Sequence, residues 1–164
     1  MAEWRRMEEG DLGFVAEVAD QVHPAFPEVP EVFASRLRLF PQGCLIALDD
    51  MGKPLGYCIA HPGLFGEPPP LDAVWTALPA AADCLYLHDV ALLPIGRGQG
   101  LGGGLLLALK PIAKPYGRLA LTAVNGSATY WRRFGFRSHE SSRIRDKLRS
   151  YGRDAAYMVL EGGG

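Results

Sequence analysis

Residues 85–110 read LYLHDVALLPIGRGQGLGGGLLLALK, and this stretch decides the fold. An apolar strand is predicted at 84–92, a glycine-rich turn follows it, and an apolar helix is predicted at 100–110. Glycines leave the backbone N–H groups of the turn uncovered, and the N-terminus of the helix adds a partial positive charge. Arg97 supplies a full charge at the same place. The order of strand, turn and helix therefore predicts a site for a phosphate group.

Two other phosphate-binding motifs fit this turn poorly. A nucleotide-binding P-loop needs Lys followed by Ser or Thr after its glycines, and neither is present. The dinucleotide pattern GxGxxG occurs at Gly98, Gly100 and Gly103, but it belongs in an early strand–helix–strand unit with an acidic residue about 20 positions later. Here the next acidic residue after Asp89 is Glu140. A dinucleotide-binding protein is therefore the weaker alternative.

The rest of the chain predicts short strands and helices in mixed order. A proline-rich stretch at 61–81 predicts a surface loop, because proline fixes φ and removes a hydrogen-bond donor. Pro111 and Pro115 are expected to end or kink the helix that begins near Gly100. Since the helices and strands do not alternate strictly, we expect one α/β domain over residues 1–164, with a mixed sheet flanked by helices. The other strands are expected at 3–7, 44–49, 55–61, 118–124 and 155–161, and the other helices at 11–22 (with Asp11 as N-cap), at 31–39 and from Ser127.

The composition is typical of a folded globular chain. Of the 164 residues, 48% are apolar and 21% are charged, which suffices for a core and argues against disorder. Cys44, Cys58 and Cys84 each stand alone in an apolar run, so we expect no metal site and a reducing compartment. The N-terminus lacks the apolar segment of a signal peptide, and no stretch approaches the roughly 18 apolar residues of a membrane span. We therefore expect a cytoplasmic protein with no membrane partner.

Charge is distributed unevenly along the chain. Residues 1–89 hold 5 basic and 14 acidic side chains, a net charge of −9. Residues 90–139 hold 7 basic side chains and no acidic one, a net charge of +7. Fifty residues without Asp or Glu indicate a segment that faces an anion. The mixed signs of the SRIRDKLR run at 142–149 indicate a solvated surface, so we expect no nucleic-acid partner.

Two motifs make the chain similar to the GNAT superfamily of N-acetyltransferases. Residues 97–102, RGQGLG, satisfy every fixed position of the family's phosphate-binding signature, [RQ]-x-x-G-x-[GA], and the preceding VALLP resembles the family's signature strand. The segment VNGSATYWRRFGF at 124–136 is similar to the second signature of the family. The resemblance covers nearly the whole chain. It implies the GNAT fold, in which a mixed, splayed central sheet is flanked by helices.

The resemblance implies acetyl-CoA as cosubstrate. Its pyrophosphate would lie on the backbone amides of the signature turn, and its pantetheine arm would run beside the signature strand like an added strand. A β-bulge in that strand would leave an amide, near Leu92, to polarise the thioester carbonyl. Asn125 matches a residue that contacts pantetheine or the adjacent strand, although a plain turn residue is an equal interpretation. The implied cofactor-binding residues are Val90, Ala91, Leu92, Arg97, Gly98, Gln99, Gly100, Leu101, Gly102 and Asn125.

The implied reaction is direct attack of a neutral amine on the thioester, which needs a group that takes a proton. His88 suits this role as a general base, and Asp89 is the alternative, directly or through water. On an alternating strand Tyr86 and His88 share one face, with Asp89 on the other unless the bulge intervenes. A half-buried strand histidine is the structural alternative for His88. The other histidines (His23, His61 and His139) are expected to be loop or cap residues.

One position departs from the family pattern. The tyrosine that protonates the leaving thiolate usually lies four residues before the glycine of the GF pair, where this chain has Trp131. An indole N–H is a donor only and cannot act as a practical acid. Tyr130 takes the role if the helix is shifted, since the segment is one residue shorter than the common form. If Tyr130 is instead a core residue, water protonates the thiolate, and a non-catalytic acetyl-CoA-binding module stays open as an alternative.

The resemblance implies an acceptor that is an amine of a small molecule or a peptide. In the family the first two helices, their connection and the loop before the signature strand surround the acceptor, and here these segments are acidic. This favours a cationic amine, and the resemblance also allows a homodimer. The acidic residues of these segments include Glu28, Glu31, Glu67, Asp72 and Asp83, and the aromatic rings expected beneath an apolar part of the acceptor are Phe26, Phe33, Phe65 or Trp75.

Overall fold

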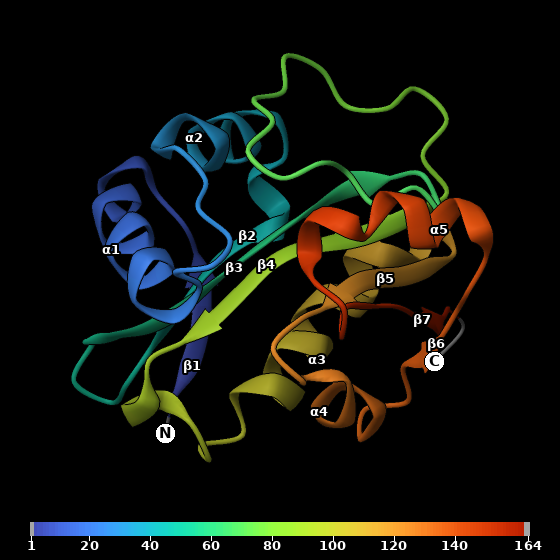
Figure 1. The fold of residues 1–164 in the computed structure, drawn as a ribbon. Helices are drawn as coiled ribbons and strands as arrows, with labels where there is room; N and C mark the ends of the chain where they lie inside the picture. Colours follow the sequence, from blue (N-terminus) through green and yellow to red (C-terminus); the bar gives the residue numbers. More distant parts are fainter. Residues whose placement is uncertain (1, 163–164) are drawn as a thin grey trace.

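Seven strands form one mixed, open sheet in the computed structural model, which describes residues 2–162 (Figure 1). The strand order is β1-β2-β3-β4-β5-β7-β6, and β4 and β5 are the parallel pair among antiparallel neighbours. The predicted α/β domain with a mixed sheet is confirmed. The strands are β1 (Glu3–Arg6), β2 (Cys44–Leu48), β3 (Pro54–Gly63), β4 (Cys84–Leu92), β5 (Arg118–Ala123), β6 (Arg137–Ser138) and β7 (Ala156–Glu161).

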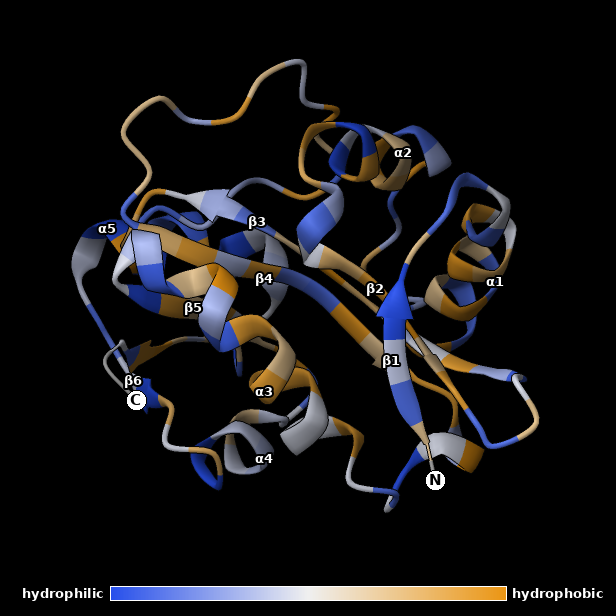
Figure 2. Cartoon of the chain, turned by 180° about the vertical axis from the view of Figure 1, so that it is seen from behind, coloured by the Kyte–Doolittle hydropathy of each residue, from blue (hydrophilic) through white to orange (hydrophobic). Residues whose placement is uncertain are grey.

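Helices cover both faces of the sheet. On one face α1 and α2 enclose a core that contains Val15 and Phe33, and on the other face the apolar side of α3 packs on the strands through Leu105 and Leu109 (Figure 2). No helix within residues 2–162 is long and apolar enough to cross a membrane. The α-helices are α1 (Leu12–Val22), α2 (Pro30–Leu39), α3 (Leu101–Ala113), α4 (Ala128–Arg132) and α5 (Ser142–Lys147).

A β-bulge in the central strand β4 sets the geometry of the site. Leu87 pairs with Ala60 and Asp89 pairs with Ile59, so His88 is an extra residue without a partner on β3. The pairing of β4 with β5 ends at Leu87, and the two strands diverge beyond that residue. The bulge therefore lies at His88, and the assignment of the thioester-polarising amide near Leu92 stays a prediction.

Two residues expected to mark helix ends, Pro111 and Asp11, have other roles in the structure. Pro111 does not end α3, which continues to Ala113, because Pro111 lies in the last turn, where only one backbone donor is lost. Pro115 lies in the 3-10 turn that follows the helix. Asp11 occupies the N-cap position of α1, but its carboxylate accepts hydrogen bonds from Arg5 and from the backbone N–H of Glu8 instead of capping the helix.

The proline-rich loop between β3 and β4 is anchored to α2. The buried guanidinium of Arg36 donates to the carbonyl of Ala73 at 2.8 Å and lies 4.0 Å from the centre of the Trp75 ring. The Trp75 ring also packs on His61, with the ring centres 4.5 Å apart. Trp75 therefore helps to hold the loop against the rest of the domain.

Candidate active site

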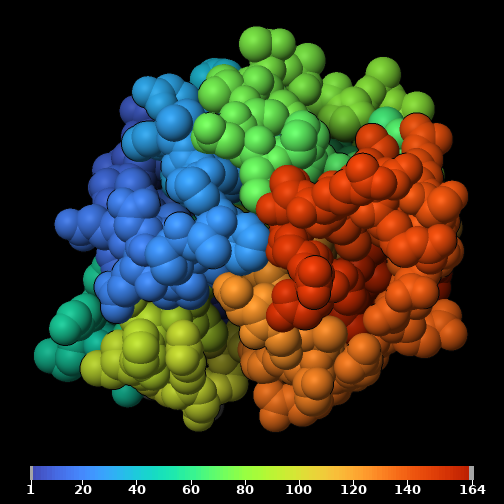
Figure 3. Space-filling model, in the orientation of Figure 1, coloured from blue at the N-terminus to red at the C-terminus, as the bar shows by residue number. Residues whose placement is uncertain are grey.

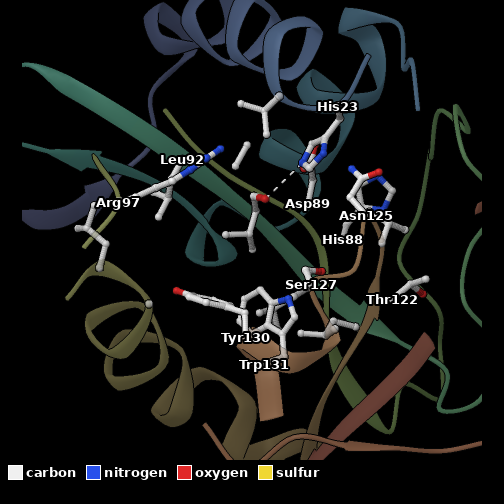
Figure 4. A pocket seen from close by; sticks show the side chains of 18 of the residues that line it. His23, His88, Asp89, Leu92, Arg97, Thr122, Asn125, Ser127, Tyr130 and Trp131 are labelled. Atoms are coloured by element: carbon white, nitrogen blue, oxygen red, sulfur yellow. Dashed lines mark hydrogen bonds and ion pairs between the residues drawn. The ribbon is translucent and has the colours of Figure 1, made fainter. Parts of the chain in front are cut away.

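A cavity of about 770 Å³ opens where β4 and β5 diverge. It runs along β4 from the glycine-rich turn, past the bulge at His88, to the connection between α1 and α2. Figure 4 shows Arg97 and Tyr130 on one side of this space and His23, His88 and Asn125 on the other. One continuous cavity thus joins the predicted phosphate site to the predicted base.

The turn before α3 offers a set of backbone N–H donors. Gly98 and Gly100 have φ angles of 76° and 74°, which glycine adopts without strain. The first N–H groups of α3, at Leu101, Gly102 and Gly103, have no acceptor among residues 2–162, as is normal for a helix start. These amides and the positive end of the helix macrodipole can hold an anion.

The charges that line this end of the cavity are positive. Arg97 and Arg133 line it, whereas Glu28 and Asp89 are the acidic residues of the lining and lie elsewhere, on the α1–α2 connection and at the bulge. Gln99 is the one predicted cofactor-binding residue that does not line the cavity. Its side-chain amide donates to the carbonyl of Ile95 at 2.6 Å, which braces the turn from outside.

His88 forms a buried pair with a residue far away in the sequence. Its Nε2 lies 2.9 Å from Oε1 of Glu28, and the two side chains are 1% and 5% exposed. Burial alone would raise the pKa of the Glu28 carboxyl, but the hydrogen bond and charge of His88 outweigh it and lower that pKa. The Nδ1 of His88 is buried and has no partner among the described residues. Glu28 therefore fixes the orientation of the His88 ring, with Nε2 as the nitrogen that makes the hydrogen bond.

Asp89 has a partner on each oxygen. The hydroxyl of Tyr57 donates to Oδ2 at 2.6 Å, and Nε2 of His23 lies 3.2 Å from Oδ1. The same His23 nitrogen is 3.3 Å from the carbonyl oxygen of Val90. Because of the bulge, His88 and Asp89 both line the cavity, whereas strict alternation would have separated them. His23 is the cap residue that was expected, at the end of α1, and it also reaches the site.

The pair His23–Asp89 gives stability a pH dependence. Burial lowers the pKa of His23, but the hydrogen bond and charge of Asp89 outweigh burial and raise the pKa above its ordinary value of 6.5. Such a histidine contributes stability that is complete below the unfolded pKa and is lost as pH rises through the folded pKa. We expect His23→Gln to reduce the free energy of unfolding more at about pH 6 than at about pH 9, measured by urea denaturation. His139→Gln, at an exposed position, is the control, and an equal loss at both pH values would contradict the assignment.

Of the two neighbouring aromatic residues, Tyr130 faces the cavity and Trp131 packs mainly in the core. Trp131 is 8% exposed and packs on Phe136 in the α3 core, with the ring centres 5.6 Å apart. Tyr130 is partly buried, and its hydroxyl lies against Gly102, where an added Cβ would come within 2.0 Å of the oxygen. In Figure 4 this hydroxyl points away from His88 and towards α3. Tyr130 thus lies at the phosphate end of the cavity.

The ends of β5 and the proline-rich loop complete the walls. Asn125 lines the cavity with a φ of 55°, a left-handed conformation that asparagine tolerates. Of the aromatic rings expected at the acceptor site, Phe26 alone lines the cavity. The expectation was wrong for the other three: Phe33 is buried in the α1–α2 core, Phe65 is covered by Arg118 and His139, and Trp75 packs under Arg36.

Tyr151 is one of the lining residues that the sequence did not indicate. It lies two residues after the 142–149 run, which the charge pattern had assigned to a solvated surface. Ile144 and Leu148 of this segment are buried, and their i, i+4 spacing was the available signal for a packed helix.

Comparison with known proteins identifies the class to which this fold and site belong. Residues 7–136 match the acetyltransferase (GNAT) family, and the chain belongs to this family of acyltransferases. The family resemblance and the fold expected from the sequence are therefore confirmed. Comparison with curated protein sequences gave no match.

Solved structures share the fold at low sequence identity. N-acetylglutamate synthase from Neisseria gonorrhoeae, complexed with coenzyme A and N-acetyl-glutamate, superposes with a TM-score of 0.73 at 17% identity, over 100% of this chain and 36% of that longer chain. Ard1 from Thermoplasma volcanium gives a TM-score of 0.72 at 13% identity, over 99% of both chains. The ribosomal-protein-S18-alanine N-acetyltransferase from Escherichia coli gives 0.65 at 19% identity, over 100% of this chain and 96% of that one.

Proposed function

We propose that this protein transfers the acetyl group of acetyl-CoA to an amine by direct attack of the amine on the thioester. One observation supports this most. A single cavity, at the point where β4 and β5 diverge, joins the free backbone amides at the start of α3 to the His88–Glu28 pair. The solved complex with coenzyme A in a protein of the same fold supports the choice of cosubstrate.

The cosubstrate would bind along β4. Its pyrophosphate accepts hydrogen bonds from the amides at the start of α3, and Arg97 neutralises charge at the cavity rim. Its pantetheine arm lies beside residues 90–92, which have no β5 partner, and bonds to their backbone. The Tyr130 hydroxyl, beside Gly102, contacts the cosubstrate near its phosphate end. Asn125 borders the opposite wall.

His88 is the base in this proposal. Nε2–H donates to the ionised Glu28, which leaves the lone pair of Nδ1 to accept the proton of the attacking amine. The amine nitrogen forms a bond to the thioester carbon, the C–S bond breaks, and the leaving thiolate takes a proton from water. The proton that His88 took from the amine returns to the resulting hydroxide, which restores the neutral base. Asp89 is less suited to the role because both of its oxygens already have partners. It positions His23 instead.

The test combines binding with turnover. We expect acetyl-CoA to raise the melting temperature of the protein, and NADH not to compete, because no acidic residue of the described chain lines the cavity beside the turn to bind a ribose. We expect release of free thiol from acetyl-CoA when an amine acceptor is added. Acetyl-CoA binding without thiol release from any amine, peptides included, would favour the non-catalytic binding module.

A further inference from the structure

Three segments that are far apart in the sequence meet over the His88 end of the cavity. They are the α1–α2 connection (23–29), the proline-rich loop (64–83) and the segment before β7 (139–155), which Figure 3 shows touching as blue, green and red surfaces. Each contributes one large apolar side chain to the cavity wall. We call these side chains, Phe26, Leu71 and Tyr151, the acceptor roof.

Contacts between the segments hold the roof closed. The α1–α2 connection bonds to the loop twice: Val29 N donates to Asp72 Oδ1 at 2.7 Å, and Asp72 N donates to Glu28 Oε2 at 2.9 Å. The loop bonds to the third segment, since the Tyr151 hydroxyl donates to the carbonyl of Pro69 at 2.7 Å. Phe26 and Tyr151 join the third segment to the first, with ring centres 6.4 Å apart. Each segment thus contacts both of the others.

This closed ring of contacts has a consequence for the size of the acceptor. A polypeptide amino terminus is followed by an extended chain, and such chains bind along open grooves or sheet edges. To reach His88 from above, the chain would have to pass between the three segments and break at least one hydrogen bond or ring contact of the roof. A compact molecule needs no such opening.

The wall chemistry beneath the roof is apolar with negative charge. Val22 and the three roof side chains supply apolar surface, and the carboxylates of Glu28 and Asp89 are the acidic groups that line the cavity. Glu28 also connects the acceptor roof to the proposed base, because its carboxylate binds His88 and accepts a hydrogen bond from the backbone of Asp72. An ammonium group is attracted to such a site, and an apolar body is sheltered by the rings.

We propose that the acceptor is a compact primary amine with an apolar body, enclosed beneath Phe26, Leu71 and Tyr151, and not the amino terminus of a polypeptide. This inference rests on the proposed acetyltransferase function. It makes Phe26 a specificity-determining residue, since its ring closes the gap between the first and third segments.

The test compares two acceptors in the same thiol-release assay. We expect kcat/KM for 2-phenylethylamine to exceed that for a hexapeptide with a free amino terminus by about 100-fold, the range that pocket shape and buried contacts provide. Phe26→Ala should reduce this preference by about tenfold, by loss of ring contact with the small amine and by opening the roof. Leu107→Ala is the matched control, because Leu107 is 74% exposed on α3 and lies outside the cavity. Its preference should equal that of the wild type.

A binding measurement separates this inference from the proposed function. By calorimetry in the presence of CoA, 2-phenylethylamine should bind the wild type and bind Phe26→Ala about tenfold more weakly. Amine binding with no thiol release would support the acceptor class and contradict the acetyltransferase proposal. Preference of the wild type for the hexapeptide, absence of amine binding, or an unchanged preference in Phe26→Ala would each overturn the inference.

Discussion

His88→Gln is expected to lower kcat/KM for the acceptor amine by about 100-fold or more, the usual contribution of a general base. Glutamine retains a polar side chain of similar length but cannot take up a proton near neutral pH. The affinity for acetyl-CoA should stay within about twofold, because the free amides of the glycine-rich turn belong to another part of the cavity. Thiol release under single-turnover conditions and calorimetry with CoA measure the two quantities.

Two further histidine variants make this prediction specific. His139→Gln changes an exposed residue outside the cavity and should leave both quantities unchanged. His23→Gln changes the other cavity histidine, whose Nε2 is held by Asp89 and the carbonyl of Val90, and should reduce kcat/KM much less than His88→Gln. The opposite ranking of His23 and His88 would assign the base to the His23–Asp89 pair.

Gly43→Ala is expected to lower the free energy of unfolding by about 3 kcal/mol, the upper part of the usual range for an overpacked core. Gly43 is buried directly before β2, and an added Cβ would lie 2.2 Å from the carbonyl oxygen of Ala60 and 2.9 Å from its carbon. These are backbone atoms of the central sheet, beside the bulge, so no side-chain rotation relieves the clash. Urea denaturation followed by circular dichroism measures the loss.

Gly13→Ala is the matched control for the same substitution. Gly13 is exposed within α1, and an added Cβ there meets nothing within 4 Å. Gly13 lies in the first turn of α1, where alanine gains at most the roughly 0.5–1 kcal/mol that it gains over glycine in a helix interior, so this variant should be at least as stable as the wild type. If both variants changed stability in the same direction, close approach to Ala60 would not be the reason for glycine at position 43.

Most of the fold follows from local patterns in the sequence. Apart from the two-residue strand β6, the strands and the first four helices lie where apolar spacing and turn residues indicate them, and the signature turn precedes α3 as expected. The short helix α5 was missed because two apolar residues, Ile144 and Leu148, stand among charged ones. Pro111 does not end the helix as expected. Two more residues follow it in α3, and the second of them, Ala113, is buried in the α3 core. Tertiary packing decided both cases.

The candidate site was predictable in its residues but not in its pairings. All predicted cofactor and catalytic residues except Gln99 line the cavity, because one strand and one turn carry most of them. The partner of His88 was not predictable, since Glu28 is 60 positions away and no local spacing joins the two. The face of Asp89 depended on the exact position of the bulge, which pairing with β3 fixes. The place of Tyr130 depended on how the short helix α4 turns its side chains between the cavity and the core.

The early end of the β4–β5 pairing divides the sheet mechanically. Three residue pairs, Leu85–Leu119, Tyr86–Ala120 and Leu87–Leu121, carry the backbone hydrogen bonding between strands β1–β4 and strands β5–β7. The molecule therefore has a seam, with the cavity as its open end. A ligand that binds in the split and contacts both sides stabilises the folded domain by RT ln(1 + [L]/Kd). The rise in unfolding free energy with ligand concentration therefore reports how fully the site between the two halves of the sheet is occupied.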